Sequence, residues 1–466
     1  MVVGDVTTGT EVLVIGGGPG GYVAGIRAGQ LGHDVTLVEA SEVGGTCLNE
    51  GCIPSKALIS ATDIAHRAGA AERLGVHADP AVDLAAMVGW KDRLVGRLTA
   101  GVESLLERAG VTVVEGRAEF NSAEEVRVVH DGEGQGSETV SFEHAVVATG
   151  SRPVELPPVP FDGDRVLSSR GALALETVPD SLAVVGAGYI GMELATVYAK
   201  LGADVTVLEQ LEDALPGYAD DLTEVVRERA AETGVDFRFG TGVEGYERLD
   251  GGVELETEGE PVAAERCLVA VGREPVTDTV GLEAAGVETD DEGFVVTDEQ
   301  GRTGRESVFA VGDVAGEPML AHAAFREGEV AAEAIDGQPA ALDSRAVPAA
   351  VFTDPEIATV GLTEEEAREE GFEPAVGEMP LRASGRALTL NEREGFVRVV
   401  ADAEHGFFLG AQVVGPEASE LVAEVTLAIE MGATLEDLAA TVHVHPTLSE
   451  AVHEAAMGAL DRSIHY

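Results

Sequence analysis

The sequence predicts an α/β fold that contains two similar units of the Rossmann type. Two segments, residues 11–40 and 181–210, align without a gap at a constant offset of 170 residues. Each has an apolar β-rich run, a G-x-G-x-x-G turn, a helical stretch and a second apolar run that leads to a Glu, which together form a βαβ unit. The chain has 466 residues and 45% hydrophobic content, enough for about three domains with buried cores.

Both repeats carry the features of a nucleotide-binding turn. The first reads EVLVIGGGPGGYVAGIRAGQLGHDVTLVEA and the second reads SLAVVGAGYIGMELATVYAKLGADVTVLEQ. The first Gly allows a tight bend, the second lets the backbone approach a pyrophosphate, and the third permits close helix–strand packing. The pyrophosphate then lies at the helix N-terminus, where free N–H groups and the helix dipole favour anions. The matching residues are Gly16, Gly18, Gly21 and Glu39 in the first repeat and Gly186, Gly188, Gly191 and Glu209 in the second.

The Glu near the end of each repeat indicates the kind of nucleotide. It lies about 20 residues after the turn, where it can accept hydrogen bonds from an adenosine ribose. One glycine fingerprint is a weak signal, but two with strand, helix and acid in register predict sites for two dinucleotides. A carboxylate at Glu209 suits a free 2′-hydroxyl and repels a 2′-phosphate, and the run VLEQLED contains no Arg, so NAD is favoured over NADP. The alternative is that Glu209 is only a solvated strand end.

Two cysteines, Cys47 and Cys52, lie in the run GGTCLNEGCIPSK shortly after the first repeat. The chain has one other cysteine, in the apolar run CLVAVG, so we do not expect disulfide bonds to stabilise this fold. A close pair beside a nucleotide site is expected to carry electrons, and the alternative is two reduced cysteines in a packed turn. Pro54 predicts a helix over 53–65 with Cys52 at its N-terminus, where the dipole and Lys56 would stabilise a thiolate.

The position of the cysteine pair also assigns the two nucleotides. The pair follows the first repeat directly, so the ligand of that repeat is expected to be the electron carrier beside it. NAD does not readily take two electrons from a dithiol without an intermediary, whereas a flavin does. We therefore expect FAD at the first repeat and NAD at the second.

The chain is strongly acidic, with 84 acidic and 30 basic residues and a net charge of −54. The acids are spread along the chain, which favours a surface adapted to high salt, where a Debye length of about 3 Å at 1 M screens self-repulsion. A basic partner or a cation sink is the alternative. The charge argues against nucleic-acid binding, and without a bilayer-length apolar run or a secretory signal we expect no membrane and a cytoplasmic location. Lysine is nearly absent, and the three present are Lys56, Lys91 and Lys200.

Six motifs along the chain resemble those of the pyridine nucleotide–disulfide oxidoreductases and follow the order found in that family. They are GGTCLNEGCIPSK, VVATGSRP, VVGAGYIGMELA, VGREP, VFAVGDVAGEPMLAHAA and HVHPTLSEA. The resemblance covers essentially the whole chain and is strongest to members that oxidise dihydrolipoamide as the flavoprotein component of 2-oxo acid dehydrogenase complexes. It implies two Rossmann-like dinucleotide-binding domains, for FAD and NAD, and a C-terminal α/β dimerisation domain. The implied boundaries are 1–149 for FAD and the redox disulfide, 150–277 for NAD, 278–347 for a central segment completing the FAD site, and 348–466 for dimerisation.

The resemblance assigns roles to the cysteines and to residues around both cofactors. Cys47 would exchange thiols with the substrate, and Cys52 would contact the flavin, with Lys56 near the flavin ring. Asp313 would bind the ribityl chain, the alternative being a turn Asp after a strand, and Glu193 would neighbour the nicotinamide. The other implied cofactor contacts are Gly16, Gly18, Gly21, Glu39, Gly45, Thr46, Thr149, Gly150, Gly186, Gly188, Gly191, Glu209, Gly272, Met319, Leu320, Ala321 and His322.

Thiol exchange needs a base, and the segment around the cysteines contains no His. In HVHPTLSEA, Pro446 is expected to begin a helical segment that brings Glu450 within reach of His445, so that the carboxylate fixes the tautomer of the ring. The resemblance implies that these two residues form the catalytic base and act from the partner subunit, which makes a homodimer necessary. His443 is expected to be an ordinary surface or packed residue. No metal site is expected, because no Cys or acidic cluster completes a pair of His443 and His445.

The resemblance implies an enzyme that oxidises protein-bound dihydrolipoamide to lipoamide and reduces NAD⁺ through Cys47, Cys52 and FAD. The carrier would be the lipoylated protein of a 2-oxo acid dehydrogenase or glycine-cleavage system. The alternatives are another FAD- and NAD(P)-dependent disulfide reductase or a non-catalytic redox sensor on the same fold. A mercuric-ion reductase would need cysteines near its C-terminus, and the C-terminal residues LDRSIHY contain none. A glutathione-type reductase would prefer NADPH, which Glu209 disfavours, and a transhydrogenase would lack the cysteine pair.

Overall fold

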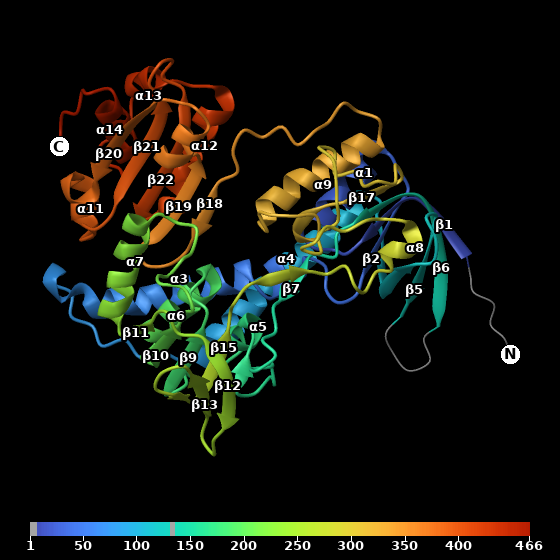
Figure 1. Ribbon diagram of the computed structural model, residues 1–466, viewed down its shortest axis with the longest axis horizontal. Helices are drawn as coiled ribbons and strands as arrows, with labels where there is room; N and C mark the ends of the chain where they lie inside the picture. Colours follow the sequence, from blue (N-terminus) through green and yellow to red (C-terminus); the bar gives the residue numbers. More distant parts are fainter. Residues whose placement is uncertain (1–6, 131–135) are drawn as a thin grey trace.

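A computed structural model describes residues 7–130 and 136–466 and confirms the α/β fold. The chain forms three lobes, each built around its own sheet (Figure 1). The middle of the chain, green in Figure 1, forms the lower lobe, and the C-terminal part, orange to red, forms a separate lobe above it. Within the described residues, no helix is both long and apolar enough to cross a membrane.

The first lobe contains a sheet of seven strands with a parallel centre. Its strands are β1 (Thr7–Ile15), β2 (Val35–Glu39), β3 (Thr112–Glu115), β4 (Arg117–Phe120), β5 (Glu125–Val129), β6 (Ser137–Val147) and β17 (Val308–Ala310). Its helices are α1 (Pro19–Leu31), α2 (Gly45–Asn49), α8 (Leu282–Ala285), η2 (Gly312–Val314) and α9 (Ala321–Ile335). The chain also extends α3 (Cys52–Ala70), η1 (Ala71–Leu74) and α4 (Leu84–Arg108) over the second lobe, where α3 and α4 contribute to the apolar core of that lobe (Figure 1). The strand order is β3-β2-β1-β6-β5-β4, and β17 returns from far along the chain to pair with β6. The first repeat therefore forms the parallel pair β1–β2 joined by α1, as predicted.

The second lobe contains the second repeat in a parallel sheet of five strands, in the order β11-β10-β9-β15-β8. These strands are β8 (Val166–Leu167), β9 (Ser181–Val185), β10 (Asp204–Leu208), β11 (Val235–Arg238) and β15 (Arg266–Val269), with helices α5 (Ser169–Leu173), α6 (Tyr189–Lys200) and α7 (Asp220–Thr233). A small antiparallel sheet adds β12 (Val243–Arg248), β13 (Val253–Thr257) and β14 (Val262–Ala264). The chain enters and leaves this lobe through an antiparallel pair, β7 (Ser151–Pro153) and β16 (Arg273–Pro275).

The third lobe contains an antiparallel sheet in the order β18-β19-β22-β21-β20. Its strands are β18 (Ala349–Val351), β19 (Glu356–Gly361), β20 (Pro374–Pro380), β21 (Phe396–Asp402) and β22 (Phe408–Gly415). Its helices are α10 (Glu364–Glu369), η3 (Leu381–Ala383), α11 (Gly385–Leu390), α12 (Ala418–Met431), α13 (Leu435–Ala440) and α14 (Glu450–Ala459). α12 packs against β19 and β22, and α14 packs against β20 and β21, so these helices and the sheet enclose one apolar core.

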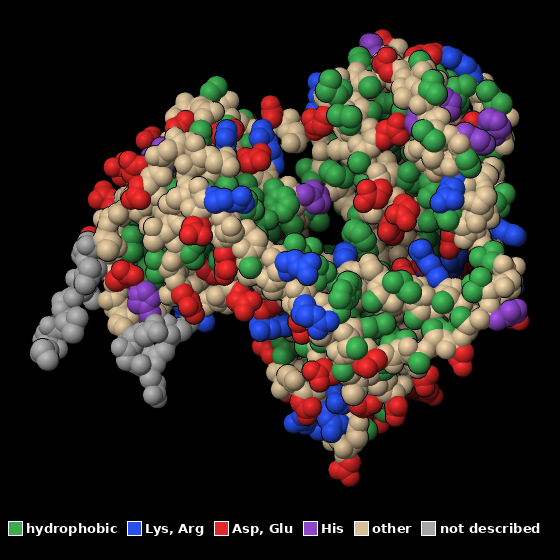
Figure 2. All heavy atoms as spheres, turned by 180° about the vertical axis from the view of Figure 1, so that it is seen from behind, with side chains coloured by type: hydrophobic (Ala, Val, Ile, Leu, Met, Phe, Trp, Pro, Cys, Tyr) green, Lys and Arg blue, Asp and Glu red, His purple; other side chains and the backbone are tan. Residues whose placement is uncertain are grey.

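All three lysines lie where segments from different parts of the chain meet. The exposed fraction of the side chain is 30% for Lys56, 7% for Lys91 and 3% for Lys200. The ammonium of Lys91 donates to the carbonyl of Leu173 at 2.8 Å, and that of Lys200 lies 2.6 Å from Asp63 Oδ1. Acidic side chains are instead spread over the whole face of the molecule that Figure 2 shows. Buried or half-buried ammonium groups with fixed partners thus contrast with a solvated, acidic exterior.

Candidate functional site

The two glycine turns have nearly the same conformation. Gly16 has a φ of +102° and Gly186 a φ of +100°, and a Cβ there would lie 2.3 Å from the carbonyl oxygen of Ala148 or 2.4 Å from that of Ala270. Both positions therefore exclude every residue except glycine. The third glycine of each turn packs against the carbonyl of the first, as the sequence predicts for close helix–strand contact.

Each turn leads into a helix whose N-terminal N–H groups have no side-chain cap. α1 begins directly after Gly18 and α6 directly after Gly188, and neither helix start receives a capping hydrogen bond from a side chain. A Cβ built at Gly188 would have no atom within 4 Å, so space is open in front of α6. Free N–H groups, the helix dipole and this space suit a pyrophosphate at each helix.

The Glu of each repeat is held by the backbone around its own turn. Glu39 accepts hydrogen bonds from the N–H of Gly17 at 2.6 Å and of Ser41 at 2.8 Å. Glu209 accepts from the N–H of Ala187 at 2.7 Å and of Leu211 at 2.9 Å. The duplication therefore extends to individual hydrogen bonds. Both carboxylates also line a cavity, so each braces its turn and faces the space expected to hold a ribose.

Three adjoining cavities connect the two turns. The cavity at the first turn has a volume of about 570 Å³, and that at the second about 1070 Å³, sizes that suit large organic ligands. A third, of about 140 Å³, shares Gly18 and Thr46 with the first and Tyr189 and Arg273 with the second. The cysteine pair lies on this middle cavity. The expected cofactor residues that line at least one of the three are Gly16, Gly18, Glu39, Gly45, Thr46, Lys56, Thr149, Gly186, Gly188, Glu193, Glu209, Gly272, Asp313, Met319, Leu320 and Ala321.

Four expected cofactor residues do not line these cavities. Gly21 and Gly191 support the turns from behind, as their packing role requires. The carbonyl of Gly150 accepts a hydrogen bond from the N–H of Val276 at 2.9 Å. His322 bonds the carbonyl of Pro348 through Nε2 at 2.7 Å. The last two residues therefore connect chain segments around the cavities.

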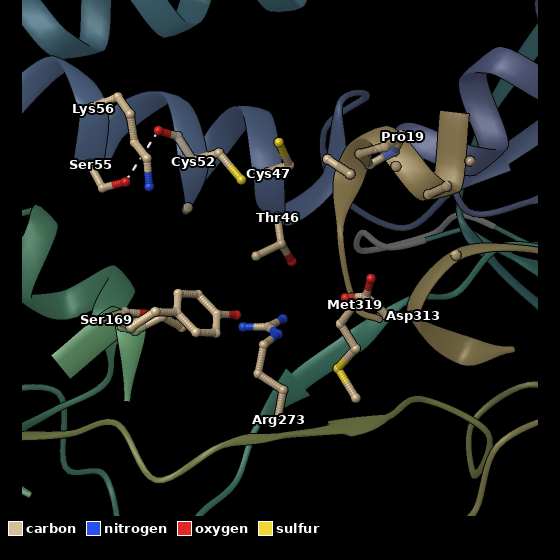
Figure 3. Close-up of a pocket in the computed structure, with 18 of the residues that line it drawn as sticks. Pro19, Thr46, Cys47, Cys52, Ser55, Lys56, Ser169, Arg273, Asp313 and Met319 are labelled. Atoms are coloured by element: carbon tan, nitrogen blue, oxygen red, sulfur yellow. Dashed lines mark hydrogen bonds between the residues drawn. The ribbon is translucent and has the colours of Figure 1, made fainter. Parts of the chain in front are cut away.

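The cysteines face one another across the start of α3 (Figure 3). Cys47 lies on α2, and Cys52 is the first residue of α3, which extends to Ala70 rather than Ala65. Both are free thiols joined by a hydrogen bond that lowers the pKa of Cys52 to about 7; burial opposes this shift, and the charge of Lys56 adds to it. The same hydrogen bond and burial raise the pKa of Cys47. Of the two thiols, Cys52 is therefore the one whose ionised form the site favours.

Lys56 and Glu193 form an ion pair at the middle cavity. The ammonium nitrogen lies 3.0 and 2.8 Å from the two carboxylate oxygens, and the Glu193 side chain is only 4% exposed. A buried carboxylate requires such a partner, because leaving it unpaired would cost several kcal/mol. Lys56 lies one helical turn after Cys52, so its charge acts on the thiolate and on the carboxylate together.

The structure adds two residues, Ser151 and Arg273, that were not among the expected site residues. Ser151 donates through Oγ to Asp313 Oδ2 at 2.5 Å. Arg273 donates to the same Ser151, through Nε to Oγ at 2.8 Å and through Nη2 to the carbonyl oxygen at 2.7 Å. Arg273 belongs to the motif VGREP, so the sequence did point to this segment. No local pattern predicts that Arg273 is linked to Asp313 through the hydroxyl of Ser151.

His445 and Glu450 form the expected pair. Nδ1 of the ring lies 2.9 Å from Glu450 Oε1, and the side chain of His445 is 81% exposed. Burial would raise the pKa of Glu450, but the Thr447 N–H and the ring hold it below its ordinary value. The expected helix start at Pro446 is wrong: α14 begins at Glu450, because the Thr447 hydroxyl and the Glu450 carboxylate close a turn before it.

His443 is a packed residue, in agreement with the sequence interpretation. Its Nε2 lies 2.9 Å from Glu424 Oε1, its Nδ1 lies 3.1 Å from the carbonyl oxygen of Thr441, and its side chain is 8% exposed. Neither His445 nor Glu450 lines the middle cavity of its own chain. Among residues 7–130 and 136–466, no three His, Cys, Asp or Glu side chains are grouped as a metal ion would need. Cys267 is buried, which raises its pKa to about 12, so it is an inert core thiol.

Comparisons with known proteins agree with this geometry. The model of the pyridine nucleotide-disulphide oxidoreductase family matches residues 10–328, and that of its dimerisation domain matches residues 347–456. The chain is 67% identical to dihydrolipoyl dehydrogenase 2 of Haloarcula marismortui over 100% of both chains. It is 61% identical to dihydrolipoyl dehydrogenase of Halobacterium salinarum and 47% identical to that of Geobacillus stearothermophilus, each over 100% of this chain and 99% of the relative.

Solved structures show the same arrangement. LpdA from Mycobacterium tuberculosis superposes with a TM-score of 0.90 at 30% identity, covering 96% of this chain and 99% of that chain. The HOCl-induced flavoprotein disulfide reductase RclA from Escherichia coli superposes with a TM-score of 0.86 at 28% identity, with the same coverage. The likeness therefore includes all three lobes.

Proposed function

Because the chain belongs to the pyridine nucleotide-disulphide oxidoreductase family, we propose that it is a dihydrolipoyl dehydrogenase. It is an oxidoreductase that oxidises dihydrolipoamide to lipoamide, reduces NAD⁺ and uses FAD and NAD as cofactors. The observation that carries this assignment is the thiol pair Cys47–Cys52 on a cavity that adjoins both glycine turns.

The residues present fit both cofactors. The adenosine half of FAD would lie at α1 with Glu39 at its ribose, and that of NAD at α6 with Glu209. The Ser151–Asp313 pair would hold the ribityl chain of FAD, and Glu193 would neighbour the nicotinamide. This arrangement supports the division into an FAD region (1–149), an NAD region (150–277), a central segment (278–347) and a dimerisation region (348–466).

The dithiol half-reaction begins with the pair as a disulfide. His445 takes a proton from one dihydrolipoyl thiol at Nε2, which is free because Nδ1 is bonded to Glu450. The new thiolate attacks Cys47 Sγ, the Cys47–Cys52 bond breaks, and Cys52 leaves as the thiolate that Lys56 stabilises. The second lipoyl thiol then gives its proton to Cys47 as its sulfur attacks the first, so the bond between Cys47 and the lipoyl group breaks and Cys47 leaves as a thiol. Lipoamide leaves as a disulfide, and the pair holds the two electrons.

The electrons then leave through the cofactors. FAD held at α1, Glu39 and Asp313 would supply a two-electron acceptor for the reduced pair and a hydride donor for NAD⁺. The chain contributes the lowered pKa of Cys52, which favours the thiolate as the electron donor, and the buried Glu193, which orients Lys56.

The dimerisation region supports a homodimer. We infer that the partner subunit's His445 is the base for the Cys47–Cys52 pair, since His445 does not line the cavity of its own chain. We also propose that the dihydrolipoyl group arrives on a lipoylated carrier of a 2-oxo acid dehydrogenase or glycine-cleavage system, and that the enzyme works in the cytoplasm.

The function is tested with the pure, FAD-loaded protein in molar KCl. We expect dihydrolipoamide to be oxidised with NAD⁺ and glutathione disulfide not to be reduced by NADH or NADPH. A second set of assays would add a lipoylated carrier domain in place of free dihydrolipoamide. Turnover of glutathione disulfide without turnover of dihydrolipoamide would assign another disulfide reductase. No turnover of any dithiol would instead favour a redox sensor.

The carboxylate of Glu209 should determine the choice of NAD⁺ over NADP⁺. In Glu209→Ser the charge that repels a 2′-phosphate is lost, so the ratio of kcat/KM for NAD⁺ to that for NADP⁺ should fall by roughly tenfold or more. Glu39→Ser is the matched control, because Glu39 braces the other turn in the same way. It should lower FAD retention and leave the nucleotide preference unchanged. Equal shifts in preference from both variants would contradict the assignment of NAD to the second turn.

A further inference from the structure

Two ion pairs of opposite polarity join α3 to α6. Lys56 on α3 pairs with Glu193 on α6 at 2.8 Å, and Asp63 on α3 pairs with Lys200 on α6 at 2.6 Å. In each helix the two partners are seven residues apart, which places them on one face two turns apart. Together the two pairs fix α3 both along and around its axis relative to α6. Because α3 begins at Cys52, they also fix the redox thiol relative to the second lobe.

A short segment of the C-terminal part of the chain, residues 352–354, contacts both ion pairs. The N–H of Phe352 donates to Glu193 Oε1 at 3.0 Å, and the Lys56 ammonium lies 4.5 Å from the centre of the Phe352 ring. Two residues later, Asp354 Oδ2 lies 2.6 Å from the Lys200 ammonium. The segment thus contacts both members of the Lys56–Glu193 pair and the lysine of the Asp63–Lys200 pair.

The Phe352 ring limits where the Lys56 ammonium can lie. The ammonium has a carboxylate on one side and an aromatic face on another, and an aromatic face attracts a cation. Lys56 lowers the pKa of Cys52, while Glu193 acts in the opposite direction. The pKa of Cys52 therefore depends on where the Lys56 ammonium lies between the Cys52 thiol and the Glu193 carboxylate. The titratable and charged groups facing Cys52 are Cys47, Lys56, Tyr189 and Glu193.

We propose that Phe352 is a positioning residue for the redox pair, which holds Lys56 and Glu193 in the arrangement that stabilises the Cys52 thiolate. The C-terminal region then contributes to the redox site twice: Phe352 acts within its own subunit, and the partner subunit's His445 acts across the dimer. The inference deepens the proposed function, and it rests on Cys47–Cys52 being the redox centre.

The thiolate content of Cys52 tests this inference without any substrate. In the FAD-loaded Cys47→Ser variant, whose serine can still donate to Cys52, the thiolate is followed by ultraviolet absorbance across pH, with Cys47→Ser/Cys52→Ser subtracted. Adding Phe352→Leu removes the ring and admits water that screens the Lys56 charge. The pH at which half of Cys52 is ionised should therefore rise by about 0.5 to 1 pH unit; this pH is called the midpoint below.

Three further variants separate positioning from simple packing. Phe352→Tyr keeps the aromatic face and should restore the midpoint. Pentafluorophenylalanine at position 352 keeps the shape but reverses the charge distribution of the ring, so it should shift the midpoint as leucine does, even if leucine impairs folding. Phe372→Leu, at a half-exposed site in the third lobe, should leave the midpoint in place. An unchanged midpoint in the leucine and pentafluoro variants would overturn the proposal whether or not dihydrolipoamide proves to be the substrate.

Discussion

Replacing Cys47 with serine should reduce dihydrolipoamide oxidation by at least about 10³-fold while the protein retains FAD. Serine cannot form the disulfide that accepts the two electrons of the substrate, so the first bond exchange is lost. The glycine turn, Glu39 and Asp313 remain, and these are the residues expected to hold the flavin. The measurement is NADH formation from dihydrolipoamide and NAD⁺, with flavin absorbance per chain measured on the same sample.

Cys267→Ala is the matched control for the loss of a thiol. Cys267 is buried in β15 and does not line the three cavities, so this variant should keep both flavin and turnover. If Cys47→Ser oxidised dihydrolipoamide at the normal rate, the role of the pair would be refuted. Loss of flavin together with activity would instead show that the serine disturbs the cofactor site.

Replacing His445 with glutamine should slow the dithiol half-reaction by about 10²- to 10⁴-fold, the contribution typical of a positioned general base. Glutamine can still bond Glu450 but cannot accept the thiol proton. Oxidation of NADH by an artificial acceptor does not need that proton transfer, so its rate should change little. Stopped-flow reduction of the enzyme by dihydrolipoamide and steady-state NADH oxidation measure the two reactions separately. Equal losses in both would contradict the role of a base.

The dimer supplies the sharper control for His445. A heterodimer of one Cys47→Ser subunit and one His445→Gln subunit should contain one intact site if the base acts across the interface, and none if it acts within one chain. The expected result is therefore about half of the normal activity, from two subunits that are each inactive as homodimers. His405→Gln, an exposed histidine of the same lobe, should leave the half-reaction unchanged.

The parts of this fold that are determined by neighbouring residues could be predicted from the sequence. The glycine turns, the helix that begins at Cys52 and the pairing of His445 with Glu450 all depend on spacings of a few residues. The helix start at α14 was wrong by four residues, because a threonine hydroxyl and the carboxylate of Glu450 close a turn where Pro446 was expected to open a helix.

Contacts between distant segments could not be predicted in the same way. Ser151 and Asp313 are 162 residues apart, and Phe352 lies 159 residues from Glu193. Neither contact has a local pattern, because each depends on how whole lobes pack. The hydrogen bonds from backbone N–H groups to Glu209 were also unforeseen. The sequence indicated a carboxylate for the nucleotide, but not that the same carboxylate braces the turn before any nucleotide binds.

The shielding of the three lysines has a practical consequence for labelling. Reagents that modify primary amines have, besides the amino terminus, only Lys56, Lys91 and Lys200 to attack, and the last two side chains are 7% and 3% exposed. Lys56 is the most accessible, and it is reached through the cavity that carries the cysteines. Among the three lysines, amine-reactive reagents should therefore modify first the one beside the redox cysteines. Attachment to a solid support should use the abundant surface carboxylates, which leave that centre untouched.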